Sequence, residues 1–291
     1  MRVTLHRETL KRKRAYLLNV AGKSAIWVVI SKGKLVVVPE PSGKSTGTGS
    51  KHGGSGNLSK LLIATFADYR IKVKRLFMKD FNTYIFDLDG TLLNTLNDLA
   101  ASTNHALRMS GMPERTVEQV RMFVGNGVHK LIERAVPEGT NREQIEAVYD
   151  EFRKYYMLHG LDSTNSYDGV PEMLAELKQR GKKMAIVSNK FYAATQELAH
   201  HFFGGIIDVA IGERDTIRKK PAPDTVFEAL RMLEVEREGA VYVGDSDVDI
   251  LTARNAGLPC ISVLWGFRDR DFLLANGATT LVETPLDIIT Q

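Results

Sequence analysis

Six short apolar runs alternate with helical stretches along the chain from residue 84 onward. Each run has the length of a buried strand: residues 84–86, 184–187, 206–211, 241–243, 261–264 and 280–282. Two of the stretches between them carry helix boundaries, because 171–180 begins with Pro171 and 247–256 stops before Gly257. This alternation predicts an α/β fold with a parallel sheet covered by helices on both faces.

The stretch between the first and second runs lacks a strand pattern and is too long for a simple crossover. Apolar residues recur at helical spacing in three segments, 96–107, 128–135 and 145–156. We therefore expect a separate helical cap over residues 98–167, inserted into a catalytic core that consists of 81–97 and 168–291.

The first 80 residues differ from the rest in charge. They hold 17 Lys and Arg against 4 Asp and Glu, whereas residues 81–291 hold 22 against 31, so the basic pI belongs to the N-terminal segment. The apolar runs 25–30 and 35–38 fit a hairpin, and residues 41–57 have the composition of a flexible Gly/Ser-rich linker. We expect a basic N-terminal extension over 1–80, with a solvated tail favoured over contact with nucleic acid or anionic lipid. A transit peptide, or a segment outside the functional unit, is the alternative.

A fragment that resembles a P-loop, SGKST at residues 42–46, lies in this linker. The P-loop pattern also requires a glycine at position 38, which is a valine here, and a strand that leads into a helix. The fragment therefore predicts no nucleotide site.

Composition also bears on the compartment. No apolar run approaches the roughly 20 residues that a membrane helix requires. The single cysteine, Cys260, excludes an internal disulfide and fits a reducing compartment. We expect a cytoplasmic protein without a membrane span, and nothing in the sequence indicates an oligomeric state.

Polar residues follow three of the predicted strands and precede one predicted helix. These segments are DLDGT at 87–91, SN at 188–189, GDSDVD at 244–249 and, before the helix, KKPAPD at 219–224. Open α/β sheets bind their ligands at the carboxyl ends of the strands. We therefore expect the four segments to meet at one edge of the sheet.

Three aspartates in these segments predict a metal site. Asp87 and Asp89 are two residues apart, so their side chains point to the same side in an extended stretch, and Asp245 adds a third carboxylate. Carboxylates at close range repel one another unless a cation or a shared proton intervenes. Mg²⁺ is the hard divalent cation most suited to phosphate chemistry, so we expect it among these three residues.

The remaining polar groups suit a phosphoryl group. Thr91 and Ser188 offer hydroxyl donors, and Lys220 offers fixed positive charge. Gly90 lets the backbone approach a ligand closely.

Some of these residues also fit a structural interpretation. Ser188 and Asn189 fit a helix cap. Asp249 lies three residues after Ser246, which is the spacing of a capping box. A capping role for Asp249 is compatible with a role in orienting the metal ligands.

With slightly wider bounds, 86–92, 188–190, 220–224 and 244–249, the four segments in this order resemble the motifs of the haloacid dehalogenase superfamily over residues 81–291. The resemblance implies a Rossmann-like parallel core with an inserted helical cap and Mg²⁺-dependent phosphatase chemistry. It implies that Asp87 attacks phosphorus and forms an aspartyl-phosphate, while Asp89 acts first as general acid and then as general base. It places the Mg²⁺ between the Asp87 carboxylate, the Asp89 backbone carbonyl and Asp245.

The same resemblance implies roles for the neighbouring residues. Those expected to bind the phosphoryl group are Thr91, Ser188, Asn189 and Lys220, and those expected to support the site are Gly90, Gly244 and Asp249.

Further similarities point to one branch of the superfamily. Thr91 at this position is the form found in its phosphatases, and GNGV at 125–128 and WGF at 265–267 are similar to the phosphoglycolate phosphatase branch. This predicts a small anionic phosphate ester as substrate, with 2-phosphoglycolate first. The loop 125–127 and Lys130 either reach the substrate or only join cap helices.

Two alternative functions follow from the same motifs. One is a pyrophosphatase, or a phosphosugar phosphatase or mutase, of the same superfamily. The other, of a different class, is a non-catalytic phosphate-binding or scaffold protein. The presence of the nucleophile, the acid/base residue and the metal carboxylate argues against the second.

Overall fold

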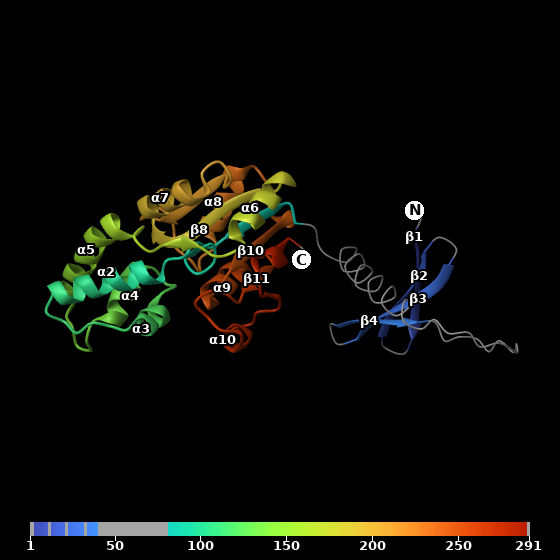
Figure 1. The fold of residues 1–291 in the computed structure, drawn as a ribbon, viewed down its shortest axis with the longest axis horizontal. Helices are drawn as coiled ribbons and strands as arrows, with labels where there is room; N and C mark the ends of the chain where they lie inside the picture. The colour runs from blue at the N-terminus through green and yellow to red at the C-terminus, as the bar shows by residue number, and fades with distance from the viewer. Residues whose placement is uncertain (1–2, 11–12, 21–22, 32–33, 40–80, 290–291) are drawn as a thin grey trace, which may run out of the picture. The chain divides into compact units, whose positions relative to one another are not determined.

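The computed structural model describes residues 3–10, 13–20, 23–31, 34–39 and 81–289, with side chains described from residue 81 (Figure 1). The chain divides into two compact units, Met1–Ala64 and Thr65–Gln291. The linker expected at 41–57 and the P-loop-like fragment at 42–46 lie outside the described residues.

The first unit contains a four-stranded antiparallel sheet in sequence order. Its strands are β1 (Val3–Leu10), β2 (Lys13–Val20), β3 (Lys23–Ser31) and β4 (Lys34–Pro39). The two apolar runs expected to form a hairpin lie in β3 and β4, which pair with Ile30 opposite Leu35.

The second unit is built on a six-stranded parallel sheet. Its strands are β5 (Thr83–Phe86), β8 (Lys183–Phe191), β9 (Val209–Glu213), β10 (Ala240–Gly244), β11 (Cys260–Val263) and β12 (Leu281–Val282). Their order is β12-β11-β10-β5-β8-β9, and every neighbouring pair runs parallel. Each of the six apolar runs overlaps one of these strands, although the run 206–211 begins three residues before β9, so the predicted α/β fold is confirmed.

Helices cover both faces of this sheet. Alternate residues of β5 enter two separate cores, Phe86 on one face and Ile85 on the other. The Phe86 face packs against α6 (Val170–Gln179) and α7 (Tyr192–Phe203), and the Ile85 face against α8 (Asp224–Leu233) and α9 (Asp247–Ala256). Burial on both faces explains why the strands are apolar throughout. Three short helical segments complete the core: η1 (Arg237–Gly239), α10 (Arg270–Ala275) and α11 (Pro285–Ile288).

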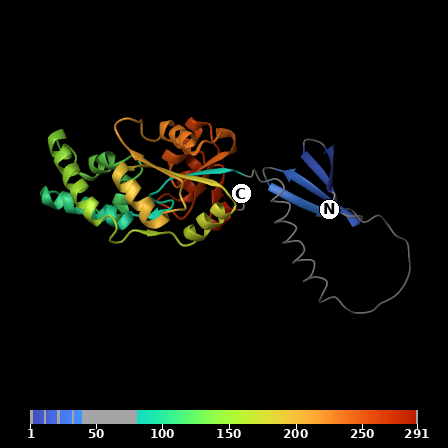
Figure 2. The same cartoon turned by 90° about the horizontal axis from the view of Figure 1, so that it is seen from above.

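A separate group of helices lies between the short strands β6 (Leu93–Asn94) and β7 (Asn165–Ser166). It consists of α2 (Leu96–Met109), α3 (Val117–Phe123), α4 (Val128–Ala135) and α5 (Arg142–His159), and lies at one end of the sheet in both views (Figure 2). These helices have a core of their own, which includes Leu107, Ile132 and Phe152. The three predicted helical segments fall on α2, α4 and α5, whereas the sequence pattern did not predict α3.

The two ends of this helical segment are tied together by one buried carboxylate. Asp98, near the start of α2, accepts hydrogen bonds from the backbone N–H of Ser163 and of Thr164 at 3.0 and 2.8 Å. It also accepts one from the Thr164 hydroxyl at 2.8 Å. Charge-assisted hydrogen bonds of this kind fix where the chain leaves and re-enters the core.

Among the helices of residues 81–289, none has the length and apolar character needed to cross a membrane.

Cys260 lies at the start of β11, and its Sγ atom is 4.0 Å from the Ser262 hydroxyl. Burial, reinforced by Asp249, raises the pKa of the Cys260 thiol to about 12, which disfavours the reactive thiolate.

Candidate active site

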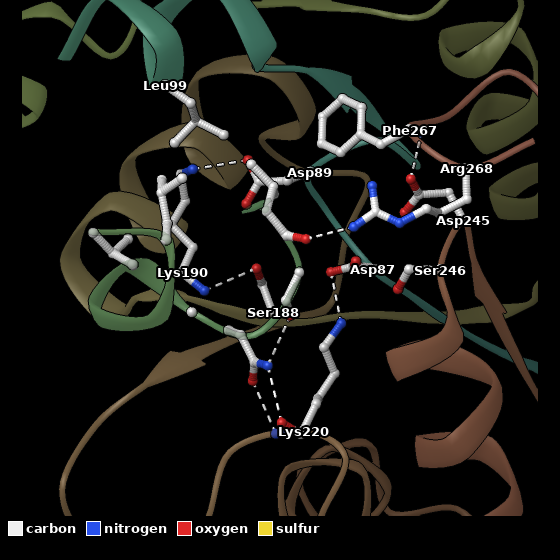
Figure 3. A pocket seen from close by; sticks show the side chains of 16 residues that line it. Asp87, Asp89, Leu99, Ser188, Lys190, Lys220, Asp245, Ser246, Phe267 and Arg268 are labelled. Carbon is white, nitrogen blue, oxygen red and sulfur yellow. Dashed lines mark hydrogen bonds and ion pairs between the residues drawn. The ribbon is translucent and has the colours of Figure 1, made fainter. Parts of the chain in front are cut away.

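The four polar segments meet in one pocket at the carboxyl ends of the strands (Figure 3). Strands β10 and β8 flank β5, so the residues that follow these three strands are neighbours. Lys220 comes from the loop before α8, and Gly125 and Gly127 come from the loop between α3 and α4. The residues that the strands contribute are Asp87, Asp89, Ser188, Asn189, Lys190, Asp245 and Ser246.

Lys220 forms the centre of a buried charge network. Its Nζ atom lies 2.8 Å from Asp87 Oδ1 and 2.9 Å from Asp249 Oδ1, and it contacts the Tyr242 hydroxyl at 3.0 Å. Burial opposes the charged form of Lys220, but the carboxylates of Asp249 and Asp87 outweigh burial and raise the pKa of the ammonium well above its usual value. The site therefore holds a permanent positive charge beside Asp87.

Three carboxylates in the pocket form a group that can hold a metal ion. One oxygen from each of Asp87, Asp245 and Asp249 lies within 4.8 Å of the other two. Burial, together with the charge of Asp249, raises the pKa of Asp87 well above its usual value and that of Asp245 to about 7. Three carboxylates this close together in a buried pocket repel one another, which favours a divalent cation with oxygen ligands.

The Asp89 carboxylate points elsewhere. It accepts hydrogen bonds from Lys190 Nζ at 2.8 Å and from the Thr95 hydroxyl at 2.6 Å. The sequence analysis expected the side chains of Asp87, Asp89 and Asp245 to gather, on the assumption of an extended chain. The chain instead turns directly after β5, because the N–H groups of residues 91–93 all bond the Leu88 carbonyl, so the carboxylates at 87 and 89 diverge.

Three glycines allow the carboxylates to sit this close to the backbone. A Cβ on Gly90, whose φ is +84°, would lie 2.4 Å from Asp245 Oδ2, and one on Gly244 would lie 2.3 Å from Asp249 Cγ. The sequence analysis expected both as supporting residues. A third, Gly266, has the same role for Asp245, since its Cβ would lie 2.3 Å from that residue's Cβ.

The residues expected to bind phosphate occupy different positions. Ser188 and Lys220 line the pocket, and the Ser188 hydroxyl accepts a hydrogen bond from Lys190 N at 3.1 Å. Thr91 is fully buried, and its hydroxyl lies 3.4 Å from Asp245 Oδ1. It therefore contacts a carboxylate of the cluster instead of the open pocket.

Asn189 contributes its side-chain amide to the backbone of a neighbouring loop. It accepts a hydrogen bond from Lys220 N at 2.8 Å and donates to Lys220 O at 3.0 Å and to Gly125 O at 3.2 Å. The amide thus fixes the peptide on which the central ammonium is mounted, and reaches the loop between α3 and α4.

Asp249 has both roles considered for it. Its Oδ2 atom closes the capping box of α9 by accepting from Ser246 N and Ser246 Oγ at 3.1 and 2.6 Å. Its Oδ1 atom faces Lys220. The structure confirms the capping interpretation, and the same carboxylate belongs to the acidic cluster.

Comparison with known proteins decides the family. Residues 84–263 match the family of haloacid dehalogenase-like hydrolases. The chain belongs to this family.

Several similar proteins are phosphatases. The chain is 33% identical to the phosphoglycolate phosphatase of Aquifex aeolicus, over 63% of this chain and 84% of that protein. It is 31% identical to phosphoglycolate phosphatase 1 of Pseudomonas aeruginosa, over 70% and 77% of the two chains. A crystal structure from Lactobacillus delbrueckii, assigned as a phosphoglycolate phosphatase, is similar with a TM-score of 0.69 and 36% identity, covering 72% of this chain and 97% of that one. The predicted family and enzyme class, a phosphatase, are thereby confirmed.

In this haloacid dehalogenase-like hydrolase, a loop after β11 connects the acidic cluster to the helical segment. The Phe267 N–H donates to Asp245 Oδ2 at 2.7 Å, and the Phe267 carbonyl accepts from Arg121 Nε at 2.7 Å. The Arg268 guanidinium donates to the carbonyls of Arg121 and Val124 at 2.7 and 2.8 Å. Sequence reasoning identified the WGF run only as a family similarity and did not assign a role to Arg268.

The loop between α3 and α4 also lies at the pocket. This is what the first of the two interpretations requires, in which the loop reaches the substrate. Gly125 and Gly127 line it. Lys130 does not, because its ammonium pairs with Glu133 on the exposed side of α4.

We predict that Gly90→Ala lowers hydrolysis of p-nitrophenyl phosphate by at least about 100-fold, because the added methyl displaces the Asp245 carboxylate. Gly111→Ala is the matched control: Gly111 has a φ of +67°, but a Cβ there meets nothing within 4 Å. Both variants carry left-handed backbone strain, so Gly111→Ala reports the loss of stability from strain alone in thermal unfolding, and Gly90→Ala adds the clash with Asp245 to it. Equal activity of the two variants would show that the contact with Asp245 is unimportant.

Proposed function

We propose that this protein is a Mg²⁺-dependent phosphomonoester hydrolase that acts through an aspartyl-phosphate on Asp87, with 2-phosphoglycolate as its first candidate substrate and the cytoplasm as its compartment. The observation that carries the proposal is the position of Asp87, beside a buried ammonium and an acidic cluster on the floor of the pocket. The relatives support the substrate, since several are phosphoglycolate phosphatases.

Asp87 is arranged for nucleophilic attack. Its Oδ1 atom is held by the Leu88 N–H at 2.7 Å and by Lys220 at 2.8 Å, so Oδ2 serves as the attacking atom. A carboxylate and an anionic phosphate repel each other, and the Lys220 ammonium lowers this repulsion along the path of attack. Ser188, at the end of β8, donates its hydroxyl to a phosphoryl oxygen.

A magnesium ion would be held by the clustered carboxylates of Asp87 and Asp245. The family resemblance adds the Asp89 backbone carbonyl as a further ligand. When bound, the ion supplies positive charge to the phosphoryl oxygens and acts as a Lewis acid. Asp249 is the least suited of the three clustered carboxylates, because one of its oxygens pairs with the Lys220 ammonium and the other accepts two hydrogen bonds from Ser246. Its role is to hold the Lys220 ammonium and the turn after β10 in place.

Asp89 transfers the proton in both steps of the reaction. Lys190 and Thr95 hold its carboxyl group away from the metal ligands. In the first step it donates a proton to the leaving alcohol oxygen, and in the second it takes one from the water that attacks the aspartyl-phosphate. One residue thus serves both halves of the reaction.

The helical segment acts as a cap, residues 98–167, over a core of 81–97 and 168–291. Loop 125–127 brings it to the pocket, and Arg121 and Arg268 join it to the loop that holds Asp245. Such a cap excludes water from the reacting phosphoryl group and limits the size of the substrate.

A substrate panel tests the proposal. The full chain is incubated with 2-phosphoglycolate, glucose 6-phosphate, β-glucose 1-phosphate and pyrophosphate, with Mg²⁺ or with EDTA, and released inorganic phosphate is measured. We expect 2-phosphoglycolate to have the highest kcat/KM, and EDTA to abolish turnover. Cleavage of pyrophosphate but not of 2-phosphoglycolate would support the pyrophosphatase alternative, and no turnover of any compound would support the non-catalytic one.

Asp87→Asn is expected to reduce kcat by about 10⁴-fold or more, because it removes the nucleophile while keeping the shape of the side chain. Asp247→Asn is the control, since Asp247 lies in the first turn of α9, does not line the pocket, and should retain activity within about twofold. Borohydride reduction during turnover, followed by mass spectrometry, should convert residue 87 to homoserine only in the wild type. Unchanged turnover of Asp87→Asn would remove Asp87 from this role.

A further inference from the structure

Lys190 places a buried ammonium in the wall of the pocket, where the reaction as described uses it only to hold Asp89. Its side chain is 2% exposed, and its Nζ atom lies 2.8 Å from Asp89 Oδ1 (Figure 3). The same atom lies 4.6 Å from the centre of the Tyr156 ring of α5, a cation–π contact. The side chain therefore bridges the core and the helical segment at the edge of the pocket.

The ammonium keeps its charge in this setting. Burial opposes the charged form, but the adjacent Asp89 carboxylate and Tyr156 outweigh burial and raise the pKa of Lys190 above its usual value. The ammonium has one carboxylate partner, Asp89, and lies beside the Tyr156 ring.

The other two cations that line this pocket have different partners. Lys220 contacts two carboxylates, Asp87 and Asp249. Arg268 donates both terminal nitrogens to backbone carbonyls at the end of α3, including those of Arg121 and Val124, and its buried Nε atom has no hydrogen-bond partner among the described residues. Of the three lining cations, Lys190 is the one that is paired with the proposed proton donor, Asp89.

Lys190 also lies where the leaving group must be. A leaving oxygen that takes a proton from Asp89 sits within about 2.6–3.2 Å of that carboxyl group. In a phosphate ester of a 2-hydroxy acid, the carboxylate is attached to the carbon that bears the leaving oxygen. The carboxylate oxygens therefore lie only about 3–4 Å from the leaving oxygen. With Lys190 Nζ at 2.8 Å from Asp89, such a carboxylate is within reach of the ammonium.

We infer that Lys190 is a specificity-determining residue that binds the carboxylate of the leaving group. This inference rests on the proposed function and narrows it to phosphate esters of small 2-hydroxy acids. The ion pair forms beside the proton donor, so it also orients the ester oxygen toward Asp89. A neutral alcohol of the same size makes no such contact and is expected to be a poorer leaving group in this pocket.

Ethyl phosphate provides the matched substrate, because it replaces the carboxylate of 2-phosphoglycolate with a methyl group. Steady-state kcat/KM is measured for both compounds with the Mg²⁺-loaded wild type, Lys190→Met and Lys190→Gln. Lys178→Met is the control with the same charge change, since Lys178 pairs with Asp208 on the surface and does not line the pocket. Turnover of ethyl phosphate by each variant reports that it is folded and that Asp89 still works.

We expect the preference for 2-phosphoglycolate over ethyl phosphate to fall by about 10- to 100-fold in both Lys190 variants, the usual loss of a charged hydrogen bond. The preference should stay unchanged in Lys178→Met. If both substrates lose activity in equal proportion, Lys190 acts only through Asp89 and the inference is wrong. It is also wrong if the preference of the Lys190 variants equals that of the wild type. If the wild type hydrolyses neither compound, it is the proposed function that fails.

Discussion

The active site depends on one buried ammonium among carboxylates. Lys220 contacts Asp87 and Asp249 directly, and Asp245 lies within the same cluster. With one ammonium and three carboxylates, the cluster has a formal surplus of two negative charges in a region with little water. Coulombic repulsion in such a region is several times stronger than in water. Burial, and after it this repulsion, raises the pKa values of Asp87 and Asp245, and a divalent cation is the species that removes the surplus.

The rest of the core serves to keep this cluster assembled. Gly90, Gly244 and Gly266 permit the close approach of backbone to carboxylate. Asn189 fixes the peptide of Lys220, and the Phe267 N–H fixes Asp245. Each of these groups is costly to replace, because an unpaired charge or polar group in this region has no water to compensate it.

The helical segment is connected to the same cluster by hydrogen bonds. Arg121 reaches the Phe267 carbonyl, and Arg268 reaches the end of α3. A shift of this segment would therefore move the loop that positions Asp245. The pocket and the helical segment are therefore joined by direct hydrogen bonds, although their hydrophobic cores are separate.

The sequence was sufficient for the sheet and for the location of the site. Apolar runs identified all six strands, and parallel strands bring their carboxyl ends to one edge, so the four polar segments had to meet. Side-chain directions were less predictable. The turn after Leu88 sends the carboxylates of Asp87 and Asp89 apart, and spacing along an extended chain does not reveal such a turn.

The sequence also could not predict contacts between segments that are distant along the chain. Lys190 stands in one of the four motifs that carry the family resemblance, but the sequence assigned it no role, and Arg268 stands in none of them. Only the tertiary structure shows that both are buried in the pocket. Helix α3 escaped prediction because it has seven residues and a single buried one, Val120, which is too little for a helical period. A signal for it does exist in the capping box of Thr116 and Gln119.

The most direct test of the central claim is the stabilisation of the protein by Mg²⁺, measured as the rise in melting temperature during a titration. A ligand that binds only the folded state raises stability in proportion to the logarithm of its concentration above Kd. The account predicts a clear rise for the wild type and for Asp247→Asn, and almost none for Asp245→Asn. An equal rise in all three proteins would contradict it, because the ion would then bind outside the cluster of Asp87, Asp245 and Asp249.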